Sequence, residues 1–309
     1  MGGLLTLVAR RLVLRMLVVA LLTTFGIHLC LSALPPKRLV DPNAKVEEQV
    51  SVRKWEMSHY LTWITSTLAF QMPISDQGTG EWEVKEFWLR VKNSLTLCLI
   101  SFLIAAGLGV FLGTLDATLE FEPLSGPPSG PTWHSFKLVQ GLIFVASSLP
   151  AYILAYLLFL GWGSDSSTFL AVVSLGLGSA LAVDVARLTQ NSHARELRSR
   201  YIESAIANGL KTQGLWPRPG YVGWHAFRNS LITILPVTAM KLPLIVSSAM
   251  IVEVVFDLPG LGESLLRALI GQDVPKILSI VLTSALFAQF CVFLSELLVY
   301  LLNPKGRVV

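Results

Sequence analysis

The sequence predicts an all-α polytopic membrane protein with six transmembrane helices and with both termini in the cytoplasm. Of its 309 residues, 53% are hydrophobic and only 14% are charged, whereas soluble domains carry about 25% charged residues. Six apolar runs are present, and each has the roughly 20 residues that cross about 30 Å of hydrocarbon. Basic residues gather in segments that would share one side of the membrane, which sets the orientation.

The first apolar run lies within residues 1–34, where it begins among three arginines and ends near Ala33. A cleaved signal peptide is the alternative interpretation of such a segment. However, the run is long enough to span the bilayer, and it ends in Leu34-Pro35-Pro36-Lys37 rather than in a small-x-small cleavage site. We therefore expect an uncleaved transmembrane helix that begins in the cytoplasm.

A mixed-charge extracytoplasmic segment at 35–92 and a five-helix core at 93–302 are expected to follow. The five spans of the core are expected at 93–115, 136–160, 168–185, 231–256 and 277–302, with a cytoplasmic tail at 303–309. In the outer segment, the stretch from His59 to Ile64 indicates a short amphipathic helix on the bilayer, with Tyr60 and Trp63 at the membrane–water boundary.

The second span carries three glycines, Gly107, Gly109 and Gly113. Because small residues let helices approach closely in lipid, we expect these glycines to form one packing face. A phosphate-binding loop is excluded, since no Gly-Lys-Ser/Thr follows them.

The connecting loops give the orientation of the core. The loop at 188–228 holds six Lys and Arg residues against two acidic ones, so it is expected in the cytoplasm, and 257–276 then becomes an outer segment. The acidic loop at 116–133 departs from this trend. Asp184 and Arg187 are expected at the inner end of the fourth span, near the interface.

The long polar break contains a stretch that can form a short helix. Ser199 is a plausible N-cap, Glu203 would complement the helix dipole from the first turn, and Gly209 can adopt the left-handed conformation of a C-terminal cap. Ser204, Ala205 and Ala207 would keep the helix surface thin. A docking helix for a partner and an ordinary interhelical loop are equally open from these residues alone.

Three stretches in this order resemble one protein family. Glu203-Ser204-Ala205 with Gly209 resembles the EAA motif of ABC-importer permeases. Tyr201 upstream and His225-Ala226-Phe227-Arg228-Asn229 downstream are similar to the dipeptide/oligopeptide/nickel branch, which has His-Ala-Leu-Arg-Asn at this place.

The third stretch lies in the second outer segment. Glu253 to Gly262 resembles the Glu-x-Val-Phe-x-x-Pro-Gly-Leu-Gly signature of that branch through Pro259, Gly260 and Gly262, and Asp273-x-Pro275 stands where the family has Asp-Tyr-Pro. The sequence departs from the family in lacking Gly-Asp-Pro after the first span, in a longer stretch at 211–224, and in having Thr233 where a proline is common.

The resemblance implies the fold of a type I ABC-importer permease in the bacterial inner membrane, acting on peptides, nickel or related small solutes. It implies a second permease subunit, two ATPase subunits that bind ATP and Mg²⁺, and an extracytoplasmic substrate-binding protein, with no nucleic acid. It also implies an ATPase-coupling set, made of Tyr201, Glu203, Ser204, Ala205, Ala207, Gly209, His225, Arg228 and Asn229.

Two charges in the fifth span are candidates for the translocation path. Charged groups inside hydrocarbon are costly and often functional, which draws attention to Lys241 and Glu253. For Lys241 the alternatives are snorkelling or burial against a partner helix. For Glu253, near the outer end of the span, the alternative is a solvated or helix-paired carboxylate.

Other functional classes fit the sequence less well. No Walker A sequence occurs, so ATP hydrolysis by this chain is not expected, and the three cysteines have no metal-ligand spacing. An intramembrane serine protease would need Gly-x-Ser-Gly, whereas Ala180 follows Ser179 here. An ion-coupled secondary transporter is the better alternative. It would require carboxylates in the middle of its spans and an internal repeat that relates its two halves, and neither is evident in the sequence.

Overall fold

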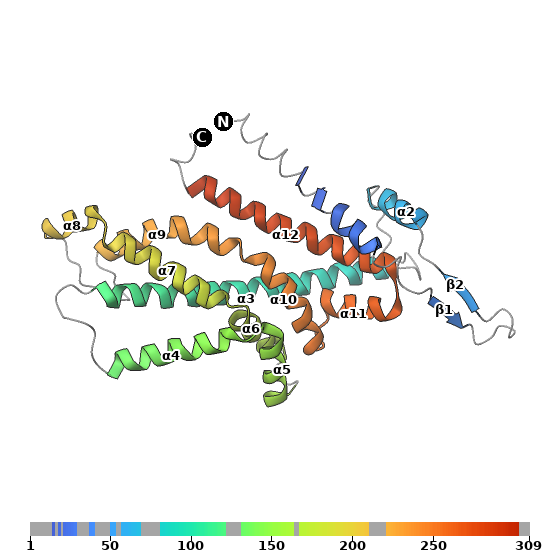
Figure 1. Cartoon of the computed structure of the whole chain (residues 1–309), viewed down its shortest axis with the longest axis horizontal. Coiled ribbons are helices and arrows are strands. Elements are labelled where there is room, and N and C mark those ends of the chain that lie inside the picture. Colours follow the sequence, from blue (N-terminus) through green and yellow to red (C-terminus); the bar gives the residue numbers. More distant parts are fainter. Residues whose placement is uncertain are drawn as a thin grey trace. The chain divides into compact units, whose positions relative to one another are not determined.

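The computed structural model describes residues 14–15, 18–19, 21–29, 37–40, 50–53, 57–68, 81–121, 131–163, 167–209 and 221–302. The chain forms two compact units (Figure 1). The first unit combines Met1–Asn93 with Pro259–Gln289, and the second combines Ser94–Leu258 with Phe290–Val309. The boundary between the units falls inside two long helices, α3 and α12.

The described elements are predominantly helical, as expected. In chain order they are β1 (Lys37–Val40), β2 (Val50–Arg53), α2 (Met57–Leu68), α3 (Glu81–Phe121), α4 (Pro131–Ser148), α5 (Ala151–Trp162), α6 (Ser167–Gly178), α7 (Leu181–Leu197), α8 (Arg200–Ala207), α9 (Tyr221–Ala239), α10 (Leu242–Val255), α11 (Leu261–Gly271) and α12 (Val274–Leu302). The first expected span is described only in part, with residues 21–29 helical.

The all-α prediction missed a small hairpin. Strands β1 and β2 pair antiparallel, with Lys37 opposite Arg53 and Val40 opposite Val50. Val40 in one strand, and Val50 and Val52 in the other, are β-branched residues, which favour strands. The runs are only four residues long, which is why a search for sustained apolar stretches passes over them.

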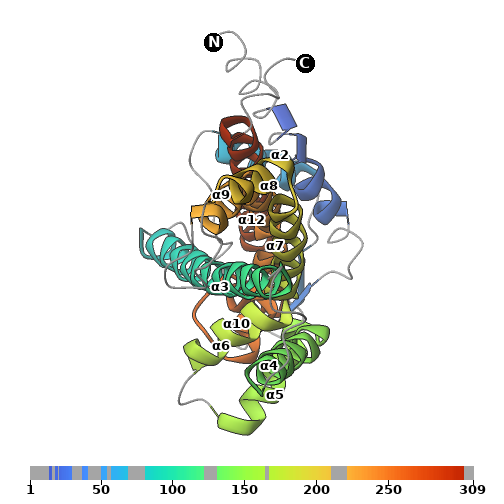
Figure 2. The same ribbon diagram turned by 90° about the vertical axis from the view of Figure 1, so that its left-hand side faces the viewer.

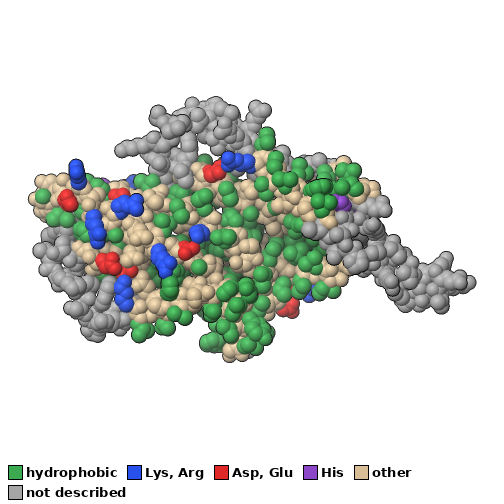
Figure 3. Space-filling model, viewed as in Figure 1, with side chains coloured by type: hydrophobic (Ala, Val, Ile, Leu, Met, Phe, Trp, Pro, Cys, Tyr) green, Lys and Arg blue, Asp and Glu red, His purple; other side chains and the backbone are tan. Residues whose placement is uncertain are grey.

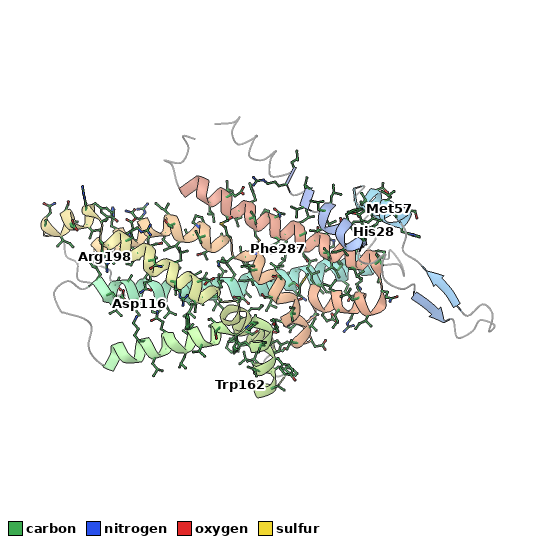
Figure 4. All side chains as sticks on the ribbon, in the orientation of Figure 1. His28, Met57, Asp116, Trp162, Arg198 and Phe287 are labelled. Atoms are coloured by element: carbon green, nitrogen blue, oxygen red, sulfur yellow. The ribbon has the colours of Figure 1, made fainter. Side chains whose placement is uncertain are left out.

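The first unit has a core built around α2. Tyr60 and Trp63 are each 3% exposed and pack with Val274 and Leu278 of α12. The Tyr60 ring also stacks on His28 with ring centroids 4.7 Å apart, and Figure 4 shows His28 beside α2. The helix expected at His59–Ile64 is therefore present, and these two aromatic side chains are buried against protein.

Helix α3 is much longer than the span expected at 93–115. It continues through Asp116 to Phe121, and α4 already begins at Pro131, so the expected loop at 116–133 is wrong at both ends. No proline or glycine interrupts the chain between Thr114 and Phe121. The polar residues that suggested a loop include Asp116, which forms an ion pair described below.

Three of the expected spans are bent helix pairs. Helices α4 and α5 meet at 106°, α6 and α7 at 45°, and α9 and α10 at 44°. With the straight segments Val84–Phe121 and Val274–Leu298, the described residues hold two helices that can cross a membrane, or up to five if each bent pair is one span.

Each bend has a local cause. Pro150 precedes α5 and cannot continue the hydrogen-bond ladder of α4. Ala180 takes a left-handed backbone conformation (φ 56°) between α6 and α7. Pro236 lies inside α9 and Pro243 lies in the first turn of α10, on either side of the third bend.

Glycines on α3 set its approach to α7. A Cβ on Gly109 would lie 2.6 Å from the carbonyl oxygen of Ala182, and one on Gly113 would crowd Ala186 and Thr189. Gly107 has nothing within 4 Å of such a Cβ. The expected three-glycine face is therefore wrong for Gly107, because residues two apart lie on nearly opposite sides of a helix.

We expect Gly109→Ala to destabilise the second unit and Gly107→Ala to be neutral or stabilising. Both changes add one methyl group and remove a helix-weakening glycine, worth up to about 1 kcal/mol in favour of the variant. Only the first places the methyl against a backbone oxygen that cannot rotate away, which costs about 1–3 kcal/mol. Thermal unfolding in detergent measures the difference, and equal melting temperatures would contradict this packing.

Candidate functional site

The short helix α8 forms at the place where the sequence predicts it. Ser199 is the N-cap residue in extended conformation, Glu203 lies in the first turn, and Gly209 follows the helix at φ +79°. The Gly209 N–H donates to the carbonyl of Ile206 at 2.9 Å. The Ser199 hydroxyl, however, donates to the carbonyl of Glu196 at 2.5 Å instead of capping α8.

One side of α8 is anchored in an apolar cluster. Ile202 is 1% exposed and packs with Leu197 of α7 and Ala226 of α9. Phe121 at the end of α3, together with Ala205 and Ile206, packs around these three residues. The short helix therefore rests on α3, α7 and α9, and in Figure 2, which views this end of the second unit, α8 lies with α7 and α9.

The other side of α8 is open. Tyr201, Glu203, Ser204 and Ala207 are exposed. Ala205 was expected on the thin exposed surface together with Ser204 and Ala207. It is instead partly buried against the apolar cluster. Positions 202, 205 and 206 are three and four residues apart and so share the inner face of the helix.

Tyr201 brings the two motifs of the loop together. Its hydroxyl donates to a carboxylate oxygen of Glu196 at 2.7 Å and accepts from the Asn229 amide at 3.1 Å. The ring lies against His225, with ring centroids 6.3 Å apart. Burial and the hydrogen bond to Glu196 raise the pKa of Tyr201, so the phenol keeps the proton that it donates. Arg228, which is exposed, completes the downstream motif.

A buried ion pair supports the end of α3. Asp116, whose side chain is 2% exposed, accepts from Lys137 Nζ at 2.6 Å and from Gln140 at 3.1 Å, both on α4 (Figure 4). Lys137 also lies 3.9 Å from Glu120. These contacts fix the last turns of α3 shortly before Phe121 enters the apolar cluster.

Charge is concentrated at this end of the second unit. In Figure 3, Lys, Arg, Asp and Glu side chains gather over the part where α7, α8 and α9 lie, whereas hydrophobic side chains cover α5. In Figure 4, Arg198 marks the joint between α7 and α8. Four arginines are exposed at this end of the unit: Arg195, Arg198, Arg200 and Arg228. The exposed side of α8 therefore lies among positively charged side chains.

The two candidate path residues have different environments. Lys241 Nζ lies 2.8 Å from a carboxylate oxygen of Asp184 on α7, and both side chains are partly exposed. Asp184 lies in the first turn of α7, which continues to Leu197. The prediction that Asp184 stands at the inner end of a span is therefore wrong. Glu253 on α10 is 1% exposed, so it is buried in protein rather than solvated.

The outer signature shapes helix ends in the first unit. Pro259 accepts through its carbonyl from the Asn93 amide at 2.9 Å, Gly260 caps α11, and Gly262 is buried in the first turn. Glu263, in the same turn, is ion-paired with Arg90 and Arg267. Helix α11 begins directly after Gly260, the last-but-one glycine of the signature being its N-cap residue.

The Asp-x-Pro stretch begins α12. Asp273 Oδ1 accepts from the backbone N–H of Lys276 at 3.3 Å, the bond of an N-cap residue. Pro275 occupies the first turn, where a missing N–H costs nothing. The motif therefore sets where the last long helix starts.

An apolar bundle with broken spans and a short helix at its charged end has the organisation of a membrane permease. Residues 133–308 match the family described as the binding-protein-dependent transport system inner membrane component. The chain belongs to this family, the inner-membrane permeases of ABC importers. The alternatives of a protease and of an ion-coupled transporter are thereby set aside.

Relatives extend the match over the length of the chain. The glutathione transport system permease protein GsiC of Salmonella typhimurium is 25% identical, with 94% of each chain covered. The dipeptide transport system permease protein DppB of Lactococcus lactis is 25% identical over 71% of this chain and 70% of its own.

Sequence reasoning missed several residues of the site. Phe121 falls within the loop expected at 116–133, and Glu196 is one of the two acidic residues of the basic loop, with no predicted partner, although it accepts a hydrogen bond from Tyr201. A usable signal existed for Ile202, because Ile202, Ala205 and Ile206 have the three- and four-residue spacing of apolar positions on one helix face. Nothing local points to Asp116 and Lys137, which meet only when α3 and α4 pack.

We expect Ile202→Ala to loosen α8 while the rest of the second unit stays folded. Truncating a buried isoleucine costs about 2 kcal/mol or more, which corresponds to roughly 30-fold faster hydrogen exchange of the helix. Ser204→Ala, on the exposed side, is the matched control and should leave exchange unchanged. Hydrogen–deuterium exchange with mass spectrometry measures both, and equal protection in the two variants would contradict the anchoring.

Proposed function

We propose that this chain is a permease subunit of an ATP-driven peptide importer with the type I permease fold. In this proposal six helices cross the membrane, both termini are cytoplasmic, and a second, different permease subunit completes the translocation path. The three bent helix pairs and two straight segments supply five of the spans, and the partly described N-terminal helix supplies the sixth.

The orientation is supported by charge. The N-terminal arginines and the basic loop at 188–228 fall on the same side when an even number of spans separates them. The exposed arginines around α8 lie in that loop. Helix α8 would then face the cytoplasm, and the α11 segment and 35–92 would face the substrate-binding protein.

Helix α8 carries the proposed coupling role. Its anchored side contacts α3, α7 and α9 through Ile202, and its open side presents Glu203, Ser204 and Ala207. A short helix with small exposed residues fits a groove on an ATPase subunit, and its anchored side can transmit a push to three helices at once. This arrangement is the single observation that supports coupling most directly.

The chemistry of ATP lies elsewhere in the assembly. We infer that two ATPase subunits bind ATP and Mg²⁺ and that this chain is not catalytic, in keeping with its family and with the lack of a Walker A sequence. Closure of the ATPases would move α8, and the spans would then switch access from outside to inside.

Peptides are the proposed cargo because relatives are named for dipeptide and glutathione transport. Among the described residues no group of His, Cys, Asp and Glu could hold a metal ion, so nothing in this part of the chain favours nickel. Lys241 and Glu253 are proposed to lie beside the path. Lys241 is held by Asp184, and the Glu253 side chain is buried.

We expect Ala207→Trp to uncouple ATP hydrolysis from uptake. The indole would occupy the open side of α8 and block its entry into the ATPase groove, so ATP-driven uptake of a labelled dipeptide should fall at least tenfold. Ala207→Ser is the matched control and should transport normally. Reconstituted complexes in proteoliposomes measure uptake and hydrolysis together, and wild-type uptake by Ala207→Trp would refute the docking assignment.

The cap of α8 offers a second test. Gly209 has φ +79° and open space around it, so a substitution there acts through the backbone alone. Gly209→Val should weaken coupling because a left-handed conformation costs a β-branched residue about 1–2 kcal/mol. Gly209→Asn should retain most uptake, since asparagine tolerates that conformation. Equal uptake by the two variants would show that the cap conformation is irrelevant to transport.

A further inference from the structure

Two of the broken spans bend by nearly the same angle. Helices α6 and α7 meet at 45°, and α9 and α10 meet at 44°. The halves that lead to α8 pack together, as α7 against α9, and the other halves pack together, as α6 against α10. Figures 1 and 2 both show α7 and α9 side by side. A change of bend in one span must therefore accompany a change in the other.

An ion pair joins the two junctions. Asp184 stands in the first turn of α7, just after the first junction, and Lys241 is the residue that precedes α10 at the second. Their charged atoms lie 2.8 Å apart, and their side chains are 43% and 36% exposed. Among the described residues of the second unit, this is the ion pair that connects helix breaks.

The backbone at both junctions is already weakened. Ala180 has φ 56°, and Pro236 removes one rung of the ladder of α9. The buried hydroxyls of Ser179 and Thr238, one beside each junction, have no hydrogen-bond partner within the described structure. Such positions bend more easily than a continuous helix, and hinges are commonly few residues at element ends.

We propose that the two junctions form one paired hinge, with Asp184 and Lys241 as positioning residues that hold the junctions together while α7, α8 and α9 swing against α6 and α10. The inference rests on the proposed coupling role of α8, which supplies the force. The pair stays closed through the cycle, because points near a hinge axis move little.

The chemistry of the pair suits this role. A lysine ammonium is a compact charge on a flexible stem, so it keeps its contact with a carboxylate as the helices rotate. Both side chains are partly exposed, so the pair keeps part of its hydration and does not carry the full cost of a buried ion pair. It can therefore hold the junctions in register during motion.

The first experiment tests whether the pair stays closed. Asp184→Cys and Lys241→Cys are combined in a chain whose native cysteines are replaced, and a short bifunctional thiol reagent links them in the reconstituted complex with its ATPases and binding protein. Because the unlinked double variant lacks both charges, its ATP-driven dipeptide uptake should be low, and we expect the link, which holds the junctions together in place of the ion pair, to raise that uptake. Arrest of uptake by the link, reversed on reduction, would overturn the proposal.

Charge exchange tests the pair itself. Asp184→Asn and Lys241→Gln should each lower uptake about tenfold and raise the ATP hydrolysed per dipeptide, whereas the exchanged pair Asp184→Lys with Lys241→Asp should recover most of the uptake. Glu86→Gln, which removes an exposed partner of Arg90 in the first unit, is the control and should change neither. Wild-type uptake in both single variants would also overturn the proposal.

Distances report the hinge directly. Spin labels at Arg195 on α7 and Ile251 on α10 should change separation by about 3 Å or more between nucleotide-free and ATP-bound complexes, since about 10° of rotation moves the end of a 17-residue helix by roughly 4 Å. Labels at Arg195 and Trp224, both on the α8 side, should keep their separation. Fixed distances for both pairs in a complex that transports would refute the hinge and leave the importer assignment intact, whereas uptake without ATP would refute the assignment.

Discussion

The second unit depends on how it satisfies backbone hydrogen bonds where its helices break. Hydrocarbon offers no partners to a free N–H or C=O, so irregular backbone is tolerated in a membrane only where protein or water surrounds it. Among the described residues, three of the five candidate spans are broken, and the breaks meet one another. Gly178, at the end of α6, lies so close to the start of α5 that a Cβ on it would be 2.6 Å from the Cα of Ala151. Just after the same break, Asp184 is ion-paired with Lys241, which precedes α10.

The same constraint explains why small residues recur where they do. Gly109 and Gly113 bring α3 against α7, and Gly178 brings the α6 break against the start of α5. In each case the neighbour is backbone, which cannot move aside as a side chain can. Close approach lets van der Waals packing hold the helices together where the hydrophobic effect cannot, and it leaves flexibility to the junctions.

Much of the site was predictable because its determinants are local. The start of α8 at Ser199, the left-handed Gly209 and the capping of α12 by Asp273 depend on residues within one or two turns. The bend angles, the inner placement of Ala205 and the Asp184–Lys241 pair depend on contacts between residues far apart in sequence. The expected spans follow from the length of the apolar runs, so they could not show that Asp184 lies just after a break between two helices, beside Lys241, rather than at the end of a span.

The contacts that hold α8 against α7 and α9 determine where a displacement of α8 would bend the helices. Helix α8 is joined to α7 by the Arg198 N–H bond to Ala194 and the Ser199 N–H bond to Glu196, at 3.2 and 3.1 Å. It is joined to α9 through Tyr201 and Asn229, and its apolar side is closed by Ile202. In the proposed coupling, a displacement of α8 would carry α7 and α9 with it, and the bend would be taken up at the junctions of these helices with α6 and α10.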